Sequence, residues 1–429
     1  MKVFLYDEFN PQDIAMMQAL YSRSADSVIK HVEKVKATGS GKFMERFYVG
    51  YGHASIADCG STTLFIEGVS MLAAKAIEDW PLFSGQESSS RYIDYSKQTI
   101  SDPLNSTESK KILDGWMNFY TKSQPRVEES LMEKYPIKEG ENEDVYKKAI
   151  KARAFDIMRG FLPAGVRTQL SWHTNLRQAS DKLFLLKHHP LLEVRELAEK
   201  ILRELKNKYP NSFGHSVLPD QENYRKFLME KYNYFFNKDV PEFKMKTNIK
   251  TSELLKFRDV ISKRPERTGL PQFLADLGNV TYDFLLDFGS FRDIQRHRNG
   301  VCRMPLVTTK LGFNEWYLAE LPVDVRKEAN ALIKEQKKAI SALKTDKETL
   351  QYYIAMGFNV SCRVTYGLPA ATYVMELRTG RAVHPTLRKV AHKMHTALKK
   401  TFPVLKTYPD LSLTDWDVRR GLQDIKERK

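Results

Sequence analysis

A set of short motifs occurs twice along this chain of 429 residues, in the same order in each half. An ordered repeat of this kind predicts two copies of one folding unit, because duplicated units keep the order of their elements. We place the boundary near residue 240, which gives a first unit at 1–240 and a second at 241–429. The repeated motifs are LPA at 162–164 and 368–370, HP at 189–190 and 384–385, and R-x-x-A-x-K at 195–200 and 388–393.

The composition is typical of a folded protein. Hydrophobic residues make up 42% of the chain and aromatic residues 11%, which is enough apolar surface to build buried cores. The start, MKVFLYDEF, lacks the basic and then apolar layout of a secretory signal, and no apolar run reaches the length of a membrane span. We therefore expect a cytoplasmic protein.

The formal net charge of +15 admits two interpretations, a site for small anionic substrates or a surface for nucleic acid. Lysine and arginine are spread along the whole chain without a recognisable nucleic-acid module, which favours the first interpretation. The three cysteines, Cys59, Cys302 and Cys362, are far apart and form no CxxC pair, and no histidine pattern of a metal site occurs. We expect neither a disulfide framework nor a bound metal.

Hydrophobic periodicity predicts a mostly helical chain with a few strands. A short strand is expected at 2–6, helices over 11–37, and a strand followed by a helix in the apolar run that begins at Thr62. Residues 97–153 have helical periodicity with expected breaks at Pro125, Pro136 and 140–142, and 209–243 has the composition of a connection.

Two polar clusters are candidates for binding anions. In the second half, Gln295-Arg296-His297-Arg298 follows an apolar run, and arginine forks suit phosphate groups. In the first half, Gln86-Glu87-Ser88-Ser89-Ser90-Arg91-Tyr92 sets a series of hydroxyls before an arginine. The structural alternatives are a solvated basic helix end for the first cluster and a serine-rich surface turn for the second.

These residues resemble the flavin-dependent thymidylate synthases, whose signature joins an RHR triplet to an ExSxRY element. Here the signature is divided between the halves. The first half has GHASIADC at 52–59 and the ExSxRY element at 87–92, but Glu78-Asp79-Trp80 in place of RHR. The second half keeps RHR at 296–298 but has Arg303-Met304-Pro305-Leu306 in place of ExSx.

The resemblance continues downstream in both halves. Arg159-Gly160-Phe161-Leu162-Pro163 resembles the family's ARxxLP element, and Asn175-Leu176-Arg177 resembles its flavin-contacting NAR element. Glu376-Leu377-Arg378 is similar to the element whose arginine polarises the uracil ring, although Arg378 could instead align with Arg177.

The resemblance implies an α+β fold, with helices around a small antiparallel sheet in each of two copies that form a pseudo-dimer within the chain. It implies methylation of dUMP to dTMP with FAD as cofactor and NADPH and methylenetetrahydrofolate as co-substrates, without a nucleophilic cysteine. The site residues that it implies are Arg378 for catalysis; Glu87, Ser88, Ser89, Ser90, Arg91, Arg159, Gln295 and Arg296 for the nucleotide; and Ser55, Asn175, Arg177, Arg296, His297 and Arg298 for the flavin.

Each half lacks what the other retains, so we expect one composite nucleotide site per chain, and a homodimer of tandem chains that replaces the family's homotetramer. Two alternatives stay open from the sequence. The chain could modify a different pyrimidine nucleotide with a flavin, or it could be a non-catalytic relative that binds nucleotide or nucleic acid.

Overall fold

The computed structural model describes residues 9–21, 27–50, 54–91, 93–214 and 217–416. The strand expected at 2–6 lies outside these residues, as do His53 and Tyr92. The described part of the chain forms helices and two small sheets, and the strand pairings are antiparallel. The α+β prediction is therefore confirmed.

The chain forms two compact units, each built from separate segments. Unit 1 contains the described residues of Met1–Val69, Ala73–Glu87 and Gln169–Asn233, and unit 2 contains those of Ser70–Leu72, Ser88–Thr168 and Tyr234–Lys429. Unit 2 thus includes Ser88–Arg91 and Arg159 from the first half of the sequence together with the described residues of the second half. Motif residues from both halves belong to one compact body.

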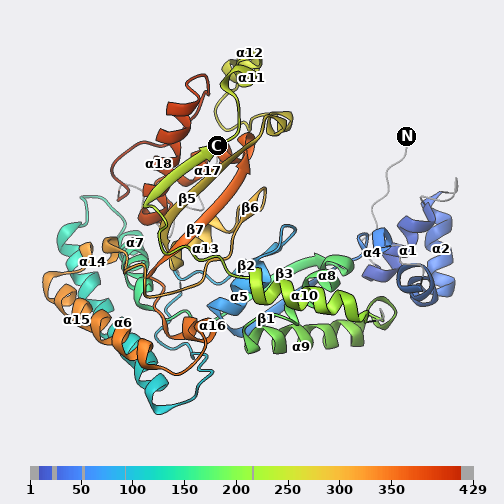
Figure 1. The fold of residues 1–429 in the computed structure, drawn as a ribbon, viewed down its shortest axis with the longest axis horizontal. Helices are drawn as coiled ribbons and strands as arrows, with labels where there is room; N and C mark the ends of the chain where they lie inside the picture. Colours follow the sequence, from blue (N-terminus) through green and yellow to red (C-terminus); the bar gives the residue numbers. More distant parts are fainter. Residues whose placement is uncertain (1–8, 22–26, 51–53, 92, 215–216, 417–429) are drawn as a thin grey trace. The chain divides into compact units, whose positions relative to one another are not determined.

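Unit 1 carries a three-stranded sheet in the order β1-β3-β2 (Figure 1). Alternate residues of β3 are buried, which is the period of two expected for a strand with one face on a core. Its elements are α1 (Pro11–Tyr21), α2 (Val28–Thr38), α3 (Gly41–Phe43), the π-helix η1 (Met44–Gly50), α4 (Ala54–Ala57), β1 (Ser61–Ser70), α5 (Met71–Glu78), β2 (Ser84–Glu87), β3 (Arg167–Asn175), α8 (Leu176–Leu186), α9 (Leu192–Lys208), η3 (Pro210–Ser212) and α10 (Pro219–Tyr232).

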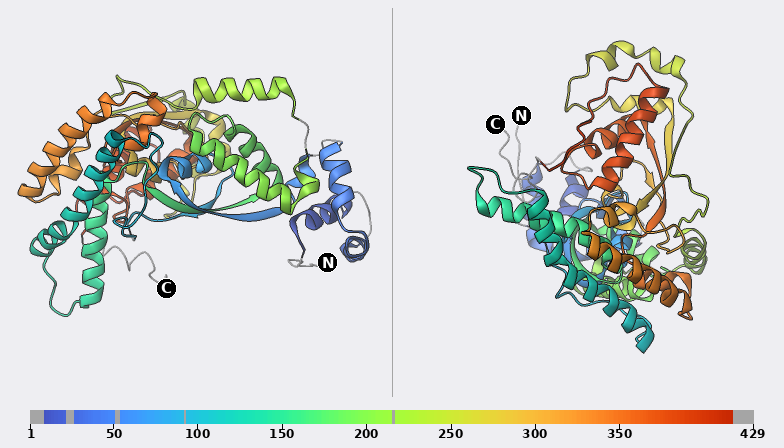
Figure 2. Two further views of the ribbon diagram at one scale, coloured as in Figure 1. Left: turned by 90° about the horizontal axis from the view of Figure 1, so that it is seen from below. Right: turned by 90° about the vertical axis from the view of Figure 1, so that its left-hand side faces the viewer.

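Unit 2 carries a four-stranded sheet in the order β4-β5-β7-β6, with α17 and α18 packed on β5 and its neighbours (Figure 1). Its helices α6, α7 and α15 pack together as a separate helical layer (Figure 2). Its elements are α6 (Thr107–Lys134), α7 (Glu143–Met158), η2 (Arg159–Phe161), β4 (Phe243–Thr247), α11 (Thr251–Leu255), α12 (Arg258–Lys263), η4 (Gln272–Leu277), β5 (Asn279–Asp287), α13 (Phe288–Ile294), β6 (Val301–Cys302), α14 (Glu315–Ala319), α15 (Val323–Ala342), α16 (Lys347–Leu350), η5 (Gln351–Tyr353), β7 (Asn359–Gly367), α17 (Leu368–Arg378) and α18 (Pro385–Thr401).

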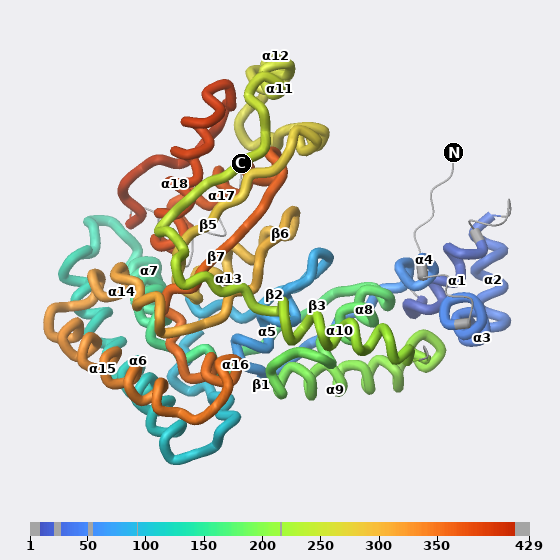
Figure 3. The backbone as a smooth tube through the Cα atoms, viewed as in Figure 1, coloured from blue at the N-terminus to red at the C-terminus, as the bar shows by residue number. Residues whose placement is uncertain are grey.

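The order of elements occurs twice along the backbone, which Figure 3 traces. The same order runs from β1 to α9 and again from β5 to α18. It consists of a strand, a short helix, a short strand, further helices, a 3-10 turn, a strand and two helices. The strand order agrees as well, because β1-β3-β2 corresponds to β5-β7-β6. The last two helices have the same lengths in both halves, 11 residues for α8 and α17 and 17 residues for α9 and α18.

Within unit 2, the two halves exchange reciprocal backbone hydrogen bonds around the bridge between Pro163 and Ala355. The Ala164 N–H donates to the Ile354 carbonyl at 2.9 Å, and the Met356 N–H donates to the Leu162 carbonyl at 2.8 Å. These bonds make Leu162-Pro163-Ala164 the counterpart of Ile354-Ala355-Met356. The predicted match between the two LPA motifs is therefore wrong, since LPA at 368–370 begins α17, one element later.

Most of the predicted elements form where the sequence places them. The helices expected over 11–37 are α1 and α2, and the apolar run from Thr62 divides into β1 and α5 as expected. The break predicted at Pro125 is wrong, because α6 continues through this proline. A proline inside a helix costs about 3 kcal/mol, but α6 buries Trp116, Tyr120 and Val127 on one face, and this packing holds the helix together.

Candidate functional site

The predicted motif at 295–298 directly follows helix α13, which itself begins where strand β5 ends. The Asp287 carboxylate accepts the Ser290 N–H at 2.8 Å and so caps the helix at its start. Residues three apart share a helical face, and this divides the helix into two sides. Arg292 and Gln295 are buried, with 3% and 2% of their surface exposed, whereas the Asp293 and Arg296 side chains are 18% and 46% exposed.

The serine-rich loop of the first half lies against this region of unit 2. The Ser90 hydroxyl accepts a hydrogen bond from the Arg292 guanidinium at 3.2 Å, and the Ser89 hydroxyl accepts the Arg91 N–H at 3.2 Å. The Arg91 Nε lies 3.1 Å from a carboxylate oxygen of buried Asp156. Arg91 is therefore held through its backbone by Ser89 and through its side chain by Asp156.

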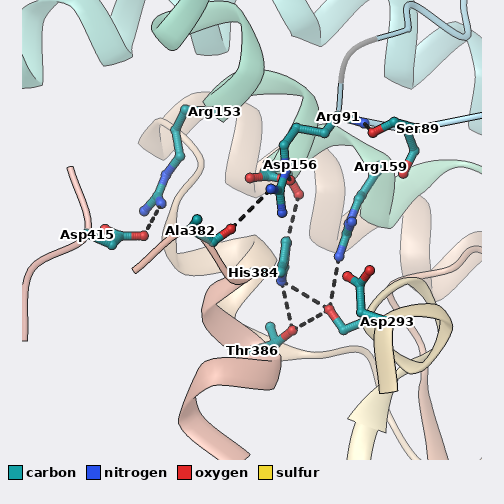
Figure 4. A network of polar contacts seen from close by, with 12 residues as sticks. Ser89, Arg91, Arg153, Asp156, Arg159, Asp293, Ala382, His384, Thr386 and Asp415 are labelled. Atoms are coloured by element: carbon teal, nitrogen blue, oxygen red, sulfur yellow. Dashed lines mark hydrogen bonds and ion pairs between the residues drawn. The ribbon is translucent and has the colours of Figure 1, made fainter. Parts of the chain in front are cut away.

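Arg159 begins η2 at the end of α7, and only 4% of its surface is exposed. Its Nη2 donates to the Ser290 hydroxyl at 3.0 Å, and that hydroxyl lies 3.1 Å from Nδ1 of buried His384. Figure 4 shows Arg91, Asp156, Arg159 and His384 in this polar network. A guanidinium from the first half is therefore oriented by side chains from the second.

Arg378, the last residue of α17, is anchored by two hydrogen bonds at 2.7 Å. Its Nη2 donates to the Asp293 carbonyl, and its Nε donates to Nε2 of His297. A ring nitrogen that accepts a hydrogen bond carries no proton, so His297 is neutral with its proton on Nδ1. Arg378 ends α17, whereas Arg177 is the second residue of α8, so the two arginines occupy different positions in their helices.

The Asp293 carboxylate is attracted electrostatically by several guanidinium groups. Burial alone would raise its pKa, but attraction by Arg296, Arg159, Arg378 and Arg91 holds the pKa well below the usual range. The Arg296 Nη1 lies 3.6 Å from the carboxylate. Two guanidiniums from each half of the sequence thus lower the pKa of one carboxylate of unit 2, and we call these four arginines the arginine cluster.

Three of the residues predicted to bind the nucleotide have other neighbours in this structure. Gln295 is turned into the interior of unit 2. The Glu87 carboxylate lies 2.8 Å from the Lys75 ammonium within unit 1, and both side chains are 1% exposed. The Ser88 carbonyl accepts the hydroxyl of Tyr95 at 3.5 Å.

The residues predicted to bind the flavin belong to both units. In unit 1, Ser55 is exposed on α4, Asn175 caps α8 by accepting the Gln178 N–H at 2.8 Å, and the Arg177 Nε lies 2.7 Å from Asp58. In unit 2, Arg298 donates to the Arg296 carbonyl at 3.2 Å. Arg296 lies 3.6 Å from the Asp293 carboxylate, and His297 accepts the hydrogen bond of Arg378, as described above.

Comparison with known families finds a match for the first half of the chain. Residues 5–211 match the family described as thymidylate synthase complementing protein. Over that stretch the chain is similar to this family. The match to this thymidylate synthase complementing family includes Ser88–Arg91 and Arg159 and ends before Asp293 and Arg378.

Relatives of similar length carry uninformative names. The chain is 24% identical to a UPF0159 protein of Thermoplasma acidophilum over 92% of this chain and 94% of that protein. It is 26% identical to a UPF0159 protein of Chlamydia muridarum, over 87% of this chain and 82% of the relative. Both similarities extend well past the family match, so these relatives resemble both halves of the chain. None of the helices in the described part of the chain is long and apolar enough to cross a membrane.

Four residues that hold the arginines in place were not predicted from the sequence: Asp156, Asp293, Ser290 and His384. One signal was available, since Asp156 precedes Arg159 by three residues and Asp293 precedes Arg296 by three. At that spacing two side chains share a helical face, and the acid can neutralise a nearby guanidinium. Ser290 and His384 offered no comparable signal, because their roles depend on contacts across long sequence distances.

The surroundings of His297 predict a dependence of stability on pH. Burial, together with Arg378, Arg296 and Arg298, lowers the pKa of His297 to about 3. An unfolded histidine titrates near 6.5. The unfolded chain therefore binds a proton in the interval between these values while the folded chain does not. The stability that His297 contributes is complete above about pH 6.5 and is lost as the pH falls toward 3.

We expect His297→Gln to flatten this dependence, because glutamine can accept the Arg378 hydrogen bond but does not titrate. Between about pH 7 and about pH 5, the wild-type protein should lose about 2 kcal/mol more unfolding free energy than the variant. Urea denaturation at a series of pH values measures the difference. Parallel profiles for the two proteins would contradict the assignment.

Proposed function

We propose that this chain methylates dUMP to dTMP with FAD as cofactor and methylenetetrahydrofolate and NADPH as co-substrates. The observation that carries the proposal is the arginine cluster, in which Arg91 and Arg159 from the first half and Arg296 and Arg378 from the second act on one point. The match of residues 5–211 to the thymidylate synthase complementing family supports it. The chain's basic character adds long-range attraction for an anionic nucleotide.

Arg91, Arg159 and Arg296 are the proposed ligands of the nucleotide phosphate. Guanidinium groups donate in a fork that matches phosphate oxygens, and each charge-assisted hydrogen bond is worth about 1.5–3 kcal/mol. Because burial shields Arg159 and Arg91 from water and salt, their attraction for an anion is screened less than that of surface arginines. The Ser290 and Asp156 contacts keep both side chains oriented before the ligand arrives.

Arg378 is the proposed catalytic residue. Its two hydrogen bonds hold the guanidinium in one orientation, and neutral His297 adds no competing positive charge. A fixed cation of this kind stabilises negative charge that develops on a pyrimidine ring, at little cost in reorganisation. Bound FAD would supply the hydride-transfer chemistry that amino-acid side chains lack.

The donors in unit 2 fit a cofactor that combines phosphates with a planar aromatic ring. The Arg296 side chain is 46% exposed, and its ion pair with Asp293 is long at 3.6 Å. The ring of Tyr373, a residue that is 56% exposed, has its centroid 6.1 Å from that of His297. Arg296, His297 and Arg298 are the proposed flavin contacts in this unit.

We also propose that the chain is a tandem duplication with one nucleotide site per chain. The repeated element order and the reciprocal hydrogen bonds around Pro163 and Ala355 support the duplication. The Met71 N–H donates to the Val166 carbonyl as the Phe288 N–H does to the Phe358 carbonyl. The proposed assembly is a homodimer, and calorimetry that finds two dUMP molecules per chain would contradict the single composite site.

The first test is whether the purified protein carries FAD. A yellow protein with a flavin absorbance spectrum and rescue of a thymidine-requiring bacterium by the gene are the expected results. A colourless protein that added FAD fails to stabilise against heat would rule out the enzyme. Bound FAD without rescue would favour a different pyrimidine nucleotide as substrate.

Ligand selectivity gives a second prediction, because the proposed site recognises the phosphate. We expect dUMP to raise the melting temperature and uridine at the same concentration to leave it nearly unchanged. Loss of the phosphate removes several charge-assisted bonds, each worth about 1.5–3 kcal/mol. Differential scanning fluorimetry on the FAD-loaded protein measures both shifts. Equal shifts with the two ligands would mean that the arginines do not bind the phosphate.

A further inference from the structure

Asp293 is a carboxylate placed inside the anion site that the arginine cluster would form. Its side chain extends from α13 to within 3.6 Å of Arg296 in the turn that follows, and Arg378 donates to its backbone carbonyl at 2.7 Å. Figure 4 shows its carboxylate beside the Arg159 guanidinium, to which it is electrostatically coupled. The side chain is 18% exposed, so solvent and ligands can reach it.

Asp156, the other carboxylate of this network, differs from Asp293 in its accessibility. Asp156 is fully buried and holds Arg91 from the interior. A ligand that approaches from solvent cannot take its place. The Asp293 side chain is 18% exposed and that of Arg296 beside it is 46% exposed, so a phosphate can approach this pair from solvent.

Two physical effects follow from a carboxylate in this position. Without it, guanidiniums held in a partly buried space would repel one another, because like charges at short range are costly where water is excluded. With it, an incoming anion is repelled by a carboxylate that already neutralises part of the positive charge. The same residue therefore stabilises the empty site and opposes its filling.

We propose that Asp293 is a resident counter-anion, which holds the arginine cluster together in the empty protein and competes with the phosphate of an incoming nucleotide. The inference rests on the proposed function, since it takes the phosphate monoester as the ligand of the cluster. A doubly charged phosphate outcompetes a single carboxylate better than a singly charged ligand does. Asp293 thus favours phosphate monoesters over monoanions and keeps the affinity low enough for release of the product.

The test uses inorganic phosphate as the probe, so that neither a pyrimidine nor a flavin is needed. Asp293→Asn removes the charge and keeps the side-chain shape. We expect this variant to bind phosphate at least about tenfold more tightly than the wild-type protein in isothermal titration calorimetry. In phosphate-free buffer of equal ionic strength it should melt at a lower temperature than wild type, and added phosphate should raise its melting temperature more than that of wild type.

Asp324→Asn is the matched control. Asp324 is an exposed partner of Arg126 in the same unit, so this variant makes the same change in net charge away from the cluster. It should bind phosphate as the wild-type protein does. A comparable gain in this control would assign the effect to net charge and overturn the proposal.

Equal or weaker phosphate binding by Asp293→Asn would overturn the proposal, as would the absence of phosphate binding in both proteins. Asp293→Ser removes the same charge with a smaller side chain and has the same expected result. If neither variant folds even with phosphate present, phosphate cannot replace the carboxylate and the proposal is wrong. Binding of FAD and dUMP by the wild-type protein despite a failed phosphate comparison would leave the proposed function intact.

Discussion

Arg91→Ala and Arg296→Ala are each expected to weaken dUMP binding by about 100-fold or more, although the two residues lie in different halves of the sequence. Each change removes charge-assisted bonds worth about 1.5–3 kcal/mol apiece from one phosphate site. Arg296 lies 3.6 Å from the Asp293 carboxylate, and both guanidiniums lower the pKa of that carboxylate. If both belong to one composite site, the double variant should be little worse than either single variant, because effects within one site are not additive.

Isothermal titration calorimetry of FAD-loaded protein with dUMP completes the cycle, with four proteins measured under one condition. Arg126→Ala is the control, because Arg126 pairs with Asp324 and Glu328 on the surface of the same unit. It should bind dUMP as the wild-type protein does. Full-affinity binding by either cluster variant, or losses that simply add in the double variant, would show that the halves do not share a site.

The fold was predictable from the sequence where local patterns decide it. The β-branched start and alanine-rich end of the run from Thr62 place the change from β1 to α5 correctly. Pro125 misled the prediction, because the local cost of a proline is overridden by burial of residues such as Trp116 on one face of α6. The false match between the LPA motifs arose because a three-residue motif does not show which element contains it.

The site was predictable in its arginines and not in their surroundings. Arg91 and Arg296 stand in motifs whose residue types and spacing by themselves indicate a site for anions. The orientation of Gln295 was not predictable, since the one-residue difference from Arg296 turns its side chain toward the interior of unit 2. The role of Asp293 was not predictable either, because it depends on three further arginines from other elements.

The first half contains a contrasting cluster at the corresponding place, which bears on the number of sites. The matching hydrogen bonds of Met71 and Phe288 fix the register of α5 against α13, so Lys75 corresponds to Arg292 and Glu78 to Gln295. The predicted match of Glu78 to Arg296 is therefore wrong by one residue. The Lys75 ammonium lies 2.5 Å from Glu78 and 2.8 Å from Glu87, and all three side chains are at most 3% exposed. Two carboxylates and one ammonium have the wrong net charge for a phosphate.

Lys75→Met is therefore expected to lower the free energy of unfolding by about 3–5 kcal/mol, because it leaves two buried carboxylates without their ammonium partner. Methionine fills a similar volume, so a cavity adds little to the loss. Chemical denaturation measures the change. Lys147→Met is the control, since the Lys147–Glu143 pair is exposed on α7 and its loss should leave the free energy of unfolding nearly unchanged. The folded Lys75→Met protein should still bind dUMP with wild-type affinity if the arginine cluster is the nucleotide site. A loss of dUMP affinity in the folded variant, or a destabilisation no larger than that of the control, would mean that Lys75 serves the ligand and that the first half keeps a working anion site of its own.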